Sequence, residues 1–224
     1  MQLDSTYLLC KKIFSSHKHG TKLPNENLLA KKYGVSRSSL REALKILKSK
    51  GIIKSKQKSG TIIDKFENMN FFDKDILLWT QGTSYSNNFR KHFLQIRMMF
   101  EPEITYLCAK NIDKKNMYEL ENIYNKLEES VEKKDDKKII LNDLAFHQKI
   151  IINCGNPILF PLSEFINHVL NLNFIANQKE QKNYFKGWQK IYLKQHEDLK
   201  NFIIKKQPLK AKNKMISIIS KNRI

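Results

Sequence analysis

The sequence predicts a mainly α-helical protein that consists of a small domain with a β-hairpin and a larger bundle of helices. Two observations lead to this prediction. The first 63 residues have the order helix, helix, turn, helix and hairpin, which is the order of a winged helix-turn-helix. From residue 91 onward, apolar residues recur at helical spacing without the alternation of a strand. We therefore expect a winged helix-turn-helix over 1–65, a connector over 66–90 and an all-helical domain over 91–224.

Capping residues divide the N-terminal part into its elements. Residues 3–16 have helical spacing, and Asn25 is typical of the N-cap of a short helix that ends at Gly34. Ser36 is expected to cap a further helix over 37–50. The stretch IIKSKQKSGTII, with its polar turn, then predicts a hairpin. The apolar stripe of the third helix consists of Leu40, Ala43, Leu44 and Leu47.

The C-terminal part predicts helices throughout, separated by caps and breakers. Asp113, the Gly155-Asn156-Pro157 stretch, Gly187 and Pro208 mark the boundaries. An all-α domain follows from this pattern. The expected helices are 91–110, 113–133, 135–153, 157–177, 187–206 and 208–222.

Positive charge is concentrated in the N-terminal part. The chain has 41 Lys and Arg against 22 Asp and Glu, and residues 1–65 alone hold 15 basic and 4 acidic residues. A basic domain is the electrostatic footprint of a nucleic-acid-binding protein. The alternative is compositional drift, because Lys, Asn and Ile are abundant along the whole chain.

The sequence also excludes several classes of protein. No apolar stretch reaches the ~18 to 20 residues of a membrane span, and the N-terminus lacks a secretory pattern. The three cysteines, Cys10, Cys108 and Cys154, are too far apart for a disulfide framework or a zinc site. We expect reduced thiols, a cytoplasmic protein and no membrane partner.

The start of the third helix has the composition of a DNA-reading element. A recognition helix places its first residues at the base edges, where arginine can contact guanine and hydroxyls can bind phosphate. The alternative is a surface helix with solvated arginines. The candidate DNA-binding residues are Ser36, Arg37, Ser38, Ser39 and Arg41 on the helix and Lys58, Ser59 and Gly60 in the wing.

Asp143, His147 and His196 form a candidate metal site. Asp143 and His147 are four residues apart on an expected helix, so both project from one face. An Asp and a His at this spacing can ligate one divalent metal. The alternative is that each histidine is an ordinary core or surface residue.

The stretch from Lys22 to Ile63 resembles the DNA-binding domain of GntR-type transcriptional regulators. Their pattern is LP-x-E, a short helix, V-S-R-x-x-L-R-E-A-L and a glycine-containing wing, and this chain has LPNE, VSRSSLREAL and Gly60. Many members have a basic residue after the glutamate, where this chain has Asn27. The resemblance implies a transcriptional regulator, a repressor, that is not an enzyme. Because one short helix reads few bases, we expect a homodimer on a palindromic double-stranded operator.

Three further stretches, RMMFEPEITYLCA, DLAFHQKIIINCGNPIL and QHEDL, resemble the all-helical FCD domain of the FadR branch of this family. The resemblance implies one divalent metal (Zn, Ni or Mn) on Asp143, His147 and His196, and a carboxylate effector bound by these residues and Arg97. A last histidine ligand is expected near position 218, where this chain has Ile218. FFDKDILLWT is similar to a segment of sugar-acid regulators in this branch, such as the galactonate repressor, which implies a sugar-acid effector.

Two other functions remain open from the sequence. A constitutive DNA-binding protein with a decayed sensor would explain the missing last histidine. A small metallohydrolase could use Asp143, His147 and His196, but the sequence has no nucleophile motif and no glycine-rich phosphate loop.

Overall fold

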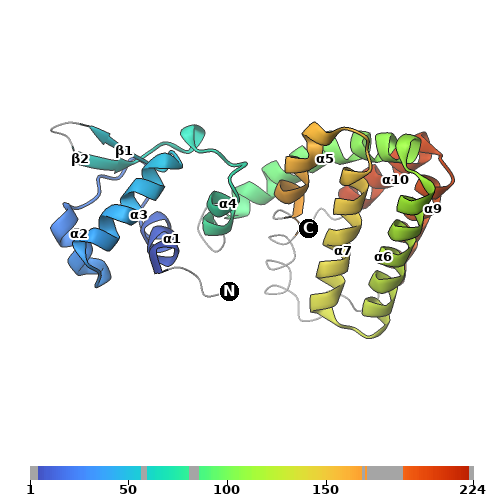
Figure 1. Ribbon diagram of the computed structural model, residues 1–224, viewed down its shortest axis with the longest axis horizontal. Coiled ribbons are helices and arrows are strands. Elements are labelled where there is room, and N and C mark those ends of the chain that lie inside the picture. The colour runs from blue at the N-terminus through green and yellow to red at the C-terminus, as the bar shows by residue number, and fades with distance from the viewer. Residues whose placement is uncertain (1–4, 57–59, 81–85, 168–169, 171–188, 222–224) are drawn as a thin grey trace. The chain divides into compact units, whose positions relative to one another are not determined.

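The computed structural model of the chain describes residues 5–56, 60–80, 86–167, 170 and 189–221 (Figure 1). The chain divides into two compact units, Met1–Ser86 and Asn87–Ile224. The first holds short helices and one hairpin, and the described residues of the second are helical apart from their connections. The predicted fold class, mainly α with an N-terminal winged helix-turn-helix and a C-terminal helical domain, is confirmed.

Three helices form the core of the first unit: α1 (Ser5–Ser16), α2 (Glu26–Tyr33) and α3 (Arg37–Ser49). The Asn25 side chain caps α2 by accepting from the backbone N–H of Leu28 at 2.9 Å. Gly34 ends α2 with a φ of 65°, a left-handed conformation that glycine adopts without strain. The buried residues that join these helices include Leu9, Ile13, Phe14, Leu29, Leu40, Ala43 and Leu47.

The wing is an antiparallel hairpin of β1 (Ile53–Lys56) and β2 (Gly60–Ile63), with Ile53 opposite Ile63. The segment before α2 pairs with the other edge of β2. The Leu23 N–H donates to Thr61 O at 2.8 Å, and the Ile63 N–H donates to Thr21 O at 2.9 Å. These backbone bonds fix the base of the wing to the helix-turn-helix.

Part of the expected connector packs on the first unit. It contains the 3₁₀ helix η1 (Phe66–Asn68) and α4 (Lys74–Thr80). Trp79 is fully buried, with its ring centroid 5.2 Å from that of Tyr7. Lys50, at the end of α3, has its Nζ 2.7 Å from a carboxylate oxygen of both Asp73 and Asp75. Helix α4 is thus attached to α1 through an aromatic contact and to α3 through a charged one.

The second unit is built from long helices. They are α5 (Ser86–Asn111), α6 (Lys114–Glu132), α7 (Asp136–Ile152), α9 (Gln189–Ile204) and α10 (Pro208–Lys221), with the 3₁₀ helix η2 (Pro157–Leu159). Asp113 and Asp135 cap α6 and α7 with their side chains. The helix expected over 157–177 begins with η2 and continues through 160–167, and most of its second half lies outside the described residues.

Helices α6 and α7 lie side by side, and α9 packs against both α6 and α10 (Figure 1). These helices bury apolar side chains between them. Because Asp143 and His147 lie on α7 and His196 on α9, this packing brings the predicted ligands of two helices into one interior. The buried residues there include Leu120, Leu127, Phe146, Ile150, Leu199 and Ile203.

Candidate functional site

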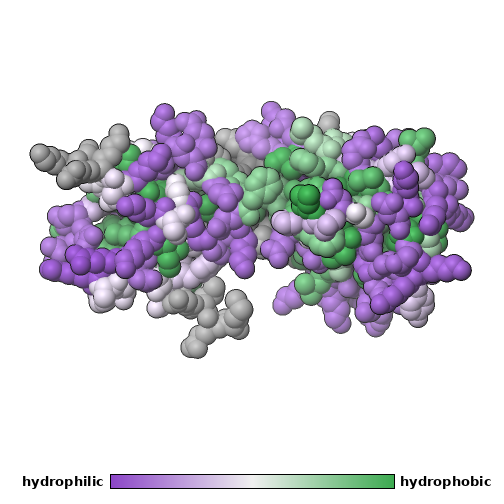
Figure 2. Space-filling view, turned by 45° about the horizontal axis from the view of Figure 1, so that its top comes forward, coloured by the Kyte–Doolittle hydropathy of each residue, from purple (hydrophilic) through white to green (hydrophobic). Residues whose placement is uncertain are grey.

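The first turn of α3 presents its polar side chains to solvent. Arg37, Ser38, Ser39 and Arg41 are exposed, while the next residues on the opposite face, Leu40, Ala43 and Leu47, are buried. Hydrophilic residues cover most of the face of the first unit that Figure 2 shows. The helix is therefore held by its apolar face, with its basic start available to a partner.

Ser36 is the N-cap of α3 and orders the hydroxyls that follow it. Its Oγ accepts from the Ser39 N–H at 3.1 Å. The same oxygen lies 2.8 Å from Ser38 Oγ and 2.9 Å from Ser39 Oγ. The hydroxyls of all three serines are thus collected at a helix N-terminus, which is a favourable place for phosphate.

Arg41 has a partner that sequence reasoning did not identify. Its Nε donates to Glu26 Oε2, at the first residue of α2, over 2.8 Å. The only signal in the sequence is the glutamate of LPNE, which gives no partner by itself.

In the wing, Gly60 begins β2 with a φ of 88°, and a Cβ there would lie 2.8 Å from Cε of Lys22. Glycine is therefore required by the backbone and brings the main chain close to any partner. The other two predicted wing contacts, Lys58 and Ser59, lie outside the described residues.

In the second unit, the structure brings Asp143, His147 and His196 together. One ligand atom from each of these residues lies within 4.8 Å of the others. Asp143 Oδ1 is 3.1 Å from His196 Nε2 and 3.9 Å from His147 Nε2. Both histidines are buried and the Asp143 side chain is 20% exposed, so the cluster of α7 and α9 residues is largely, but not fully, shielded from solvent.

Tyr192, on α9, contacts two residues of this cluster. Its hydroxyl donates to Asp143 Oδ1, and its backbone carbonyl lies 2.8 Å from His196 Nδ1. Burial alone would raise the pKa of Asp143, but the neighbouring His196, His147 and Tyr192 outweigh it and hold that pKa below its usual range. Asp143 is therefore an anion at neutral pH, as a metal ligand must be.

Arg97 joins the cluster through Glu101, both on α5. Arg97 contacts Glu101 through Nε and, at 3.3 Å, through Nη2. Glu101 Oε2 lies 3.0 Å from His147 Nδ1. Burial raises the pKa of Glu101, but Arg97 and His147 overcome this effect and lower it to about 2. Sequence reasoning used Glu101 only to locate Arg97 and assigned it no part in the site.

The donor set fits a divalent transition metal. Two imidazole nitrogens and one carboxylate oxygen suit Zn, Ni or Mn. His196 Nε2 is a buried ring nitrogen whose 3.1 Å approach to Asp143 Oδ1 does not have the geometry of a regular hydrogen bond, so both atoms could instead face a cation. Ile218, where a fourth histidine was expected, is buried on α10 and offers no donor. Among the described residues three could serve as ligands, which would leave room for a water or an effector oxygen.

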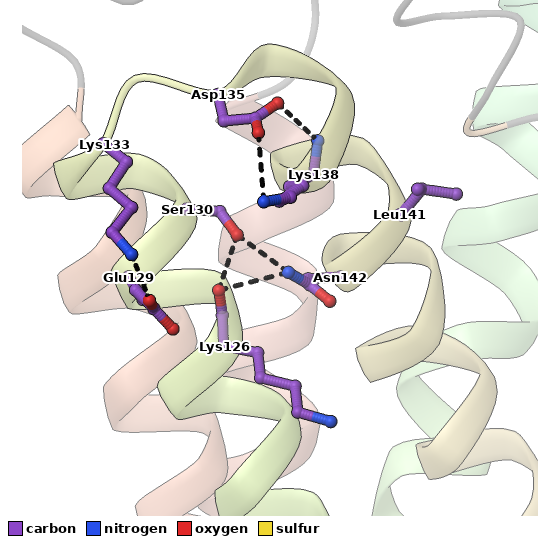
Figure 3. A pocket seen from close by; sticks show the side chains of 8 residues that line it. All are labelled: Lys126, Glu129, Ser130, Lys133, Asp135, Lys138, Leu141 and Asn142. Carbon is purple, nitrogen blue, oxygen red and sulfur yellow. Dashed lines mark hydrogen bonds and ion pairs between the residues drawn. The ribbon is translucent and has the colours of Figure 1, made fainter.

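A separate surface pocket of about 230 Å³ lies between α6 and α7 (Figure 3). The Asp143, His147 and His196 cluster does not line it. Lys133 pairs with Glu129, and Lys138 pairs with Asp135, so most of its charge is neutralised internally. Asn142 donates to Ser130 Oγ at 2.8 Å, which ties the two helices together. The pocket is therefore a surface groove between α6 and α7 whose polar lining residues mostly bind one another.

No helix in the described part of the chain is long and apolar enough to cross a membrane.

Two protein families match the chain. Residues 9–63 match the family described as bacterial regulatory proteins, gntR family, and residues 92–221 match the FCD domain. The first match covers α1 to the wing, and the second covers the helices that carry Arg97, Asp143, His147 and His196.

Several characterised and uncharacterised regulators are similar to this chain. The Escherichia coli HTH-type regulator YieP is 28% identical over 78% of each chain. The galactonate operon transcriptional repressor of E. coli is 25% identical over 64% of this chain and 62% of its own length. LutR of Bacillus subtilis is 30% identical over 69% of this chain and 67% of its own.

Solved structures share the fold. A Streptococcus agalactiae GntR protein superposes with a TM-score of 0.54 at 24% identity, over 96% of this chain and 97% of its own. Lar, which controls the expression of the Listeria monocytogenes agr system, superposes with a TM-score of 0.66 at 14% identity, over 99% of this chain and 96% of its own.

Proposed function

Because this chain belongs to the GntR family of bacterial regulatory proteins and carries an FCD domain, we propose that it is a cytoplasmic homodimeric repressor that responds to a small carboxylate, a sugar acid. DNA-binding transcriptional regulation is the function of this family. The domains would be 1–65 for DNA binding, 66–90 as a connector and 91–224 for the effector and the dimer contact. The name of one relative, the galactonate operon transcriptional repressor of E. coli, supports a sugar acid.

The exposed start of α3 would read a palindromic operator. Arg37 and Arg41 would contact guanine edges in the major groove, and Ser36, Ser38 and Ser39 would bond phosphates. Lys58, Ser59 and Gly60 would approach the DNA backbone from the wing. Two copies related by two-fold symmetry would double the number of bases read.

The buried cluster of the second unit would bind the effector. Asp143, His147 and His196 would hold one divalent metal, which would supply positive charge for a carboxylate or hydroxyl oxygen of the ligand. Arg97 would add a second positive group through Nη1, since its Nε and Nη2 already contact Glu101. An effector that binds one arrangement of the dimer more tightly would shift the population toward it and so change operator affinity.

The observation that carries this proposal is the cluster of Asp143, His147 and His196, with an arginine attached to it through Glu101. The test begins with elemental analysis of protein purified without chelator. DNA selected from a random pool then serves in anisotropy titrations with a panel of sugar acids, each with and without added metal. We expect one metal per chain and one acid that weakens operator binding by roughly tenfold or more.

Ile218 favours the decayed-sensor alternative, because an apolar residue stands where the family's last ligand is expected. Specific DNA binding that no metal or sugar acid changes, together with no thermal stabilisation by any of them, would support that alternative. A turnover assay with added Zn²⁺ or Mn²⁺ separates both from a hydrolase.

A further inference from the structure

Glu101 is a buried carboxylate next to the candidate metal site, outside its ligand set. Its side chain is 2% exposed, as is that of Arg97, one helical turn earlier on α5. It is not part of the three-residue group whose ligand atoms lie within 4.8 Å of one another. Its contacts are instead to Arg97 on one side and to His147 Nδ1, at 3.0 Å, on the other. A buried charge in this position requires a partner, and here it has two.

Glu101 provides an acceptor for the His147 ring nitrogen that lies away from Asp143. A neutral imidazole has one N–H, and the ring nitrogen next to an acceptor keeps it. Nδ1 lies 3.0 Å from the Glu101 carboxylate, and Nε2 faces Asp143 at 3.9 Å, so both ring nitrogens have an acceptor. When a cation takes the place of the proton on Nε2, Glu101 keeps the remaining N–H on Nδ1.

His196 is oriented in the same way by a different acceptor. Its Nδ1 lies 2.8 Å from the Tyr192 carbonyl, and its Nε2 lies 3.1 Å from Asp143 Oδ1. Both rings thus have an acceptor behind Nδ1 and Asp143 in front of Nε2. A cation bound by Asp143 and the two Nε2 atoms would therefore find the remaining N–H of each ring already provided with an acceptor.

We propose that Glu101 is a positioning residue of the metal site, which orients His147 for coordination through Nε2 while Arg97 holds Glu101 in place. This inference rests on the metal binding proposed above. Acceptors behind a metal-ligating histidine fix its ring and its protonation, and their loss weakens metal binding by about 10- to 100-fold. Arg97 then affects the metal through Glu101, in addition to any contact with an effector.

Two double variants separate the effect of the Glu101 oxygen acceptor from the effect of its negative charge. Removing Glu101 alone would leave the Arg97 guanidinium buried without a partner, which destabilises the fold. Arg97→Met with Glu101→Gln removes both charges but keeps an oxygen acceptor near His147. Arg97→Met with Glu101→Leu removes the acceptor as well. The measurements are Zn²⁺ and Mn²⁺ affinity by calorimetry on the full chain, the visible spectrum of the Co²⁺-loaded protein, and the melting temperature.

We expect the Gln double variant to bind metal more tightly than the Leu double variant by about tenfold or more, with an altered Co²⁺ spectrum in the latter. Ile112→Ala, which leaves a cavity at a buried residue after the end of α5, is the control for general instability and should leave the metal affinity unchanged. Equal metal affinity in wild type and the Leu double variant would overturn the role of Glu101 alone. Absence of metal binding by wild type would instead overturn the proposed metal site itself, and this inference with it.

Discussion

Arg41 Nε lies 2.8 Å from Glu26 Oε2, which links the first turn of α3 to the first residue of α2. The side chains are 67% and 46% exposed, so the pair adds little to stability. Its effect is on orientation, because an arginine with many rotamers is held beside the N-terminus of the proposed recognition helix. The two helices of the helix-turn-helix are therefore joined at the surface that would face DNA.

Arg41→Ala should abolish specific operator binding and leave the fold intact. A bidentate contact to guanine accounts for about 1–3 kcal/mol of discrimination for each base pair, and a dimer loses it twice. The exposed side chain makes no contact in the buried core, so the melting temperature should hardly change. Anisotropy titrations with selected and scrambled DNA measure the ratio of the two affinities. Lys48→Ala, the same charge change near the other end of α3, should preserve that ratio, and an unchanged footprint with Arg41→Ala would refute the assigned role.

Glu26→Gln should lower the discrimination between operator and scrambled DNA while raising the affinity for both. Removing an anion near DNA strengthens binding to any sequence. Releasing Arg41 adds about 0.5–1.5 kcal/mol of ordering cost to the specific complex, which is a several-fold loss of discrimination. Glu67→Gln removes an exposed, lysine-paired anion elsewhere in the first unit and serves as the control. In an Arg41→Ala background, Glu26→Gln should no longer change the ratio of the affinities for operator and scrambled DNA. If it changes this ratio as much there as in the wild type, orientation of Arg41 is not the cause.

The sequence was sufficient for features that depend on neighbouring residues. Asn25 and Ser36 cap their helices, and Gly34 ends α2 in a left-handed conformation, as the local pattern predicts. The spacing of Asp143 and His147 likewise places both on one face of α7. In each case the physical cause lies within one helical turn, so helical periodicity and cap chemistry are enough to predict it.

Contacts between distant segments could not be predicted from the sequence. Glu26 and Arg41 are 15 residues apart, and Glu101 reaches His147 on another helix. The FFDKDILLWT segment is a further example, because its Trp79 and its two aspartates pack against α1 and Lys50. Such partners depend on how helices pack in three dimensions, and a single sequence does not encode their pairing in any local pattern.

Ile218→His should tighten metal binding if α10 lies where the family's last ligand is expected. A fourth protein ligand replaces a water on the ion, so we expect an affinity gain of about tenfold or more. Ile219→His is a matched control, because both isoleucines are 1% exposed and the next residue projects from another face of α10. Calorimetry with Zn²⁺ compares the two variants. Equal affinities would mean that position 218 does not border the site, and the assignment of the missing ligand would be wrong.

The ion pairs of Lys50 should make the stability of the first unit depend on pH in the acid range. Burial alone would raise the pKa of Asp73, but the hydrogen bond from Lys50 outweighs it, so that the native pKa lies below its usual value. The unfolded chain then binds more protons, and the stabilisation is complete above the ordinary carboxyl value of 3.8 and is lost as the pH falls through the lowered native pKa. Urea unfolding at a series of pH values, followed by Trp79 fluorescence in a Trp188→Phe background, measures this loss.

Asp73→Asn should weaken the dependence of the unfolding free energy on pH in the acid range. Lys50→Met should lower the free energy of unfolding by about 1–3 kcal/mol near neutral pH, because Asp73 and Asp75 lose their shared cation. Lys65→Met, which removes an exposed lysine paired with Glu67 at 3.6 Å, is the control and should have little effect. Because Lys50 ends α3 and its two partners begin α4, a loss of stability confined to the Lys50 and Asp73 variants would show that this ion pair attaches α4 to the helix-turn-helix. Acid unfolding of Asp73→Asn that is as steep as that of wild type would place the acid sensitivity in other carboxylates.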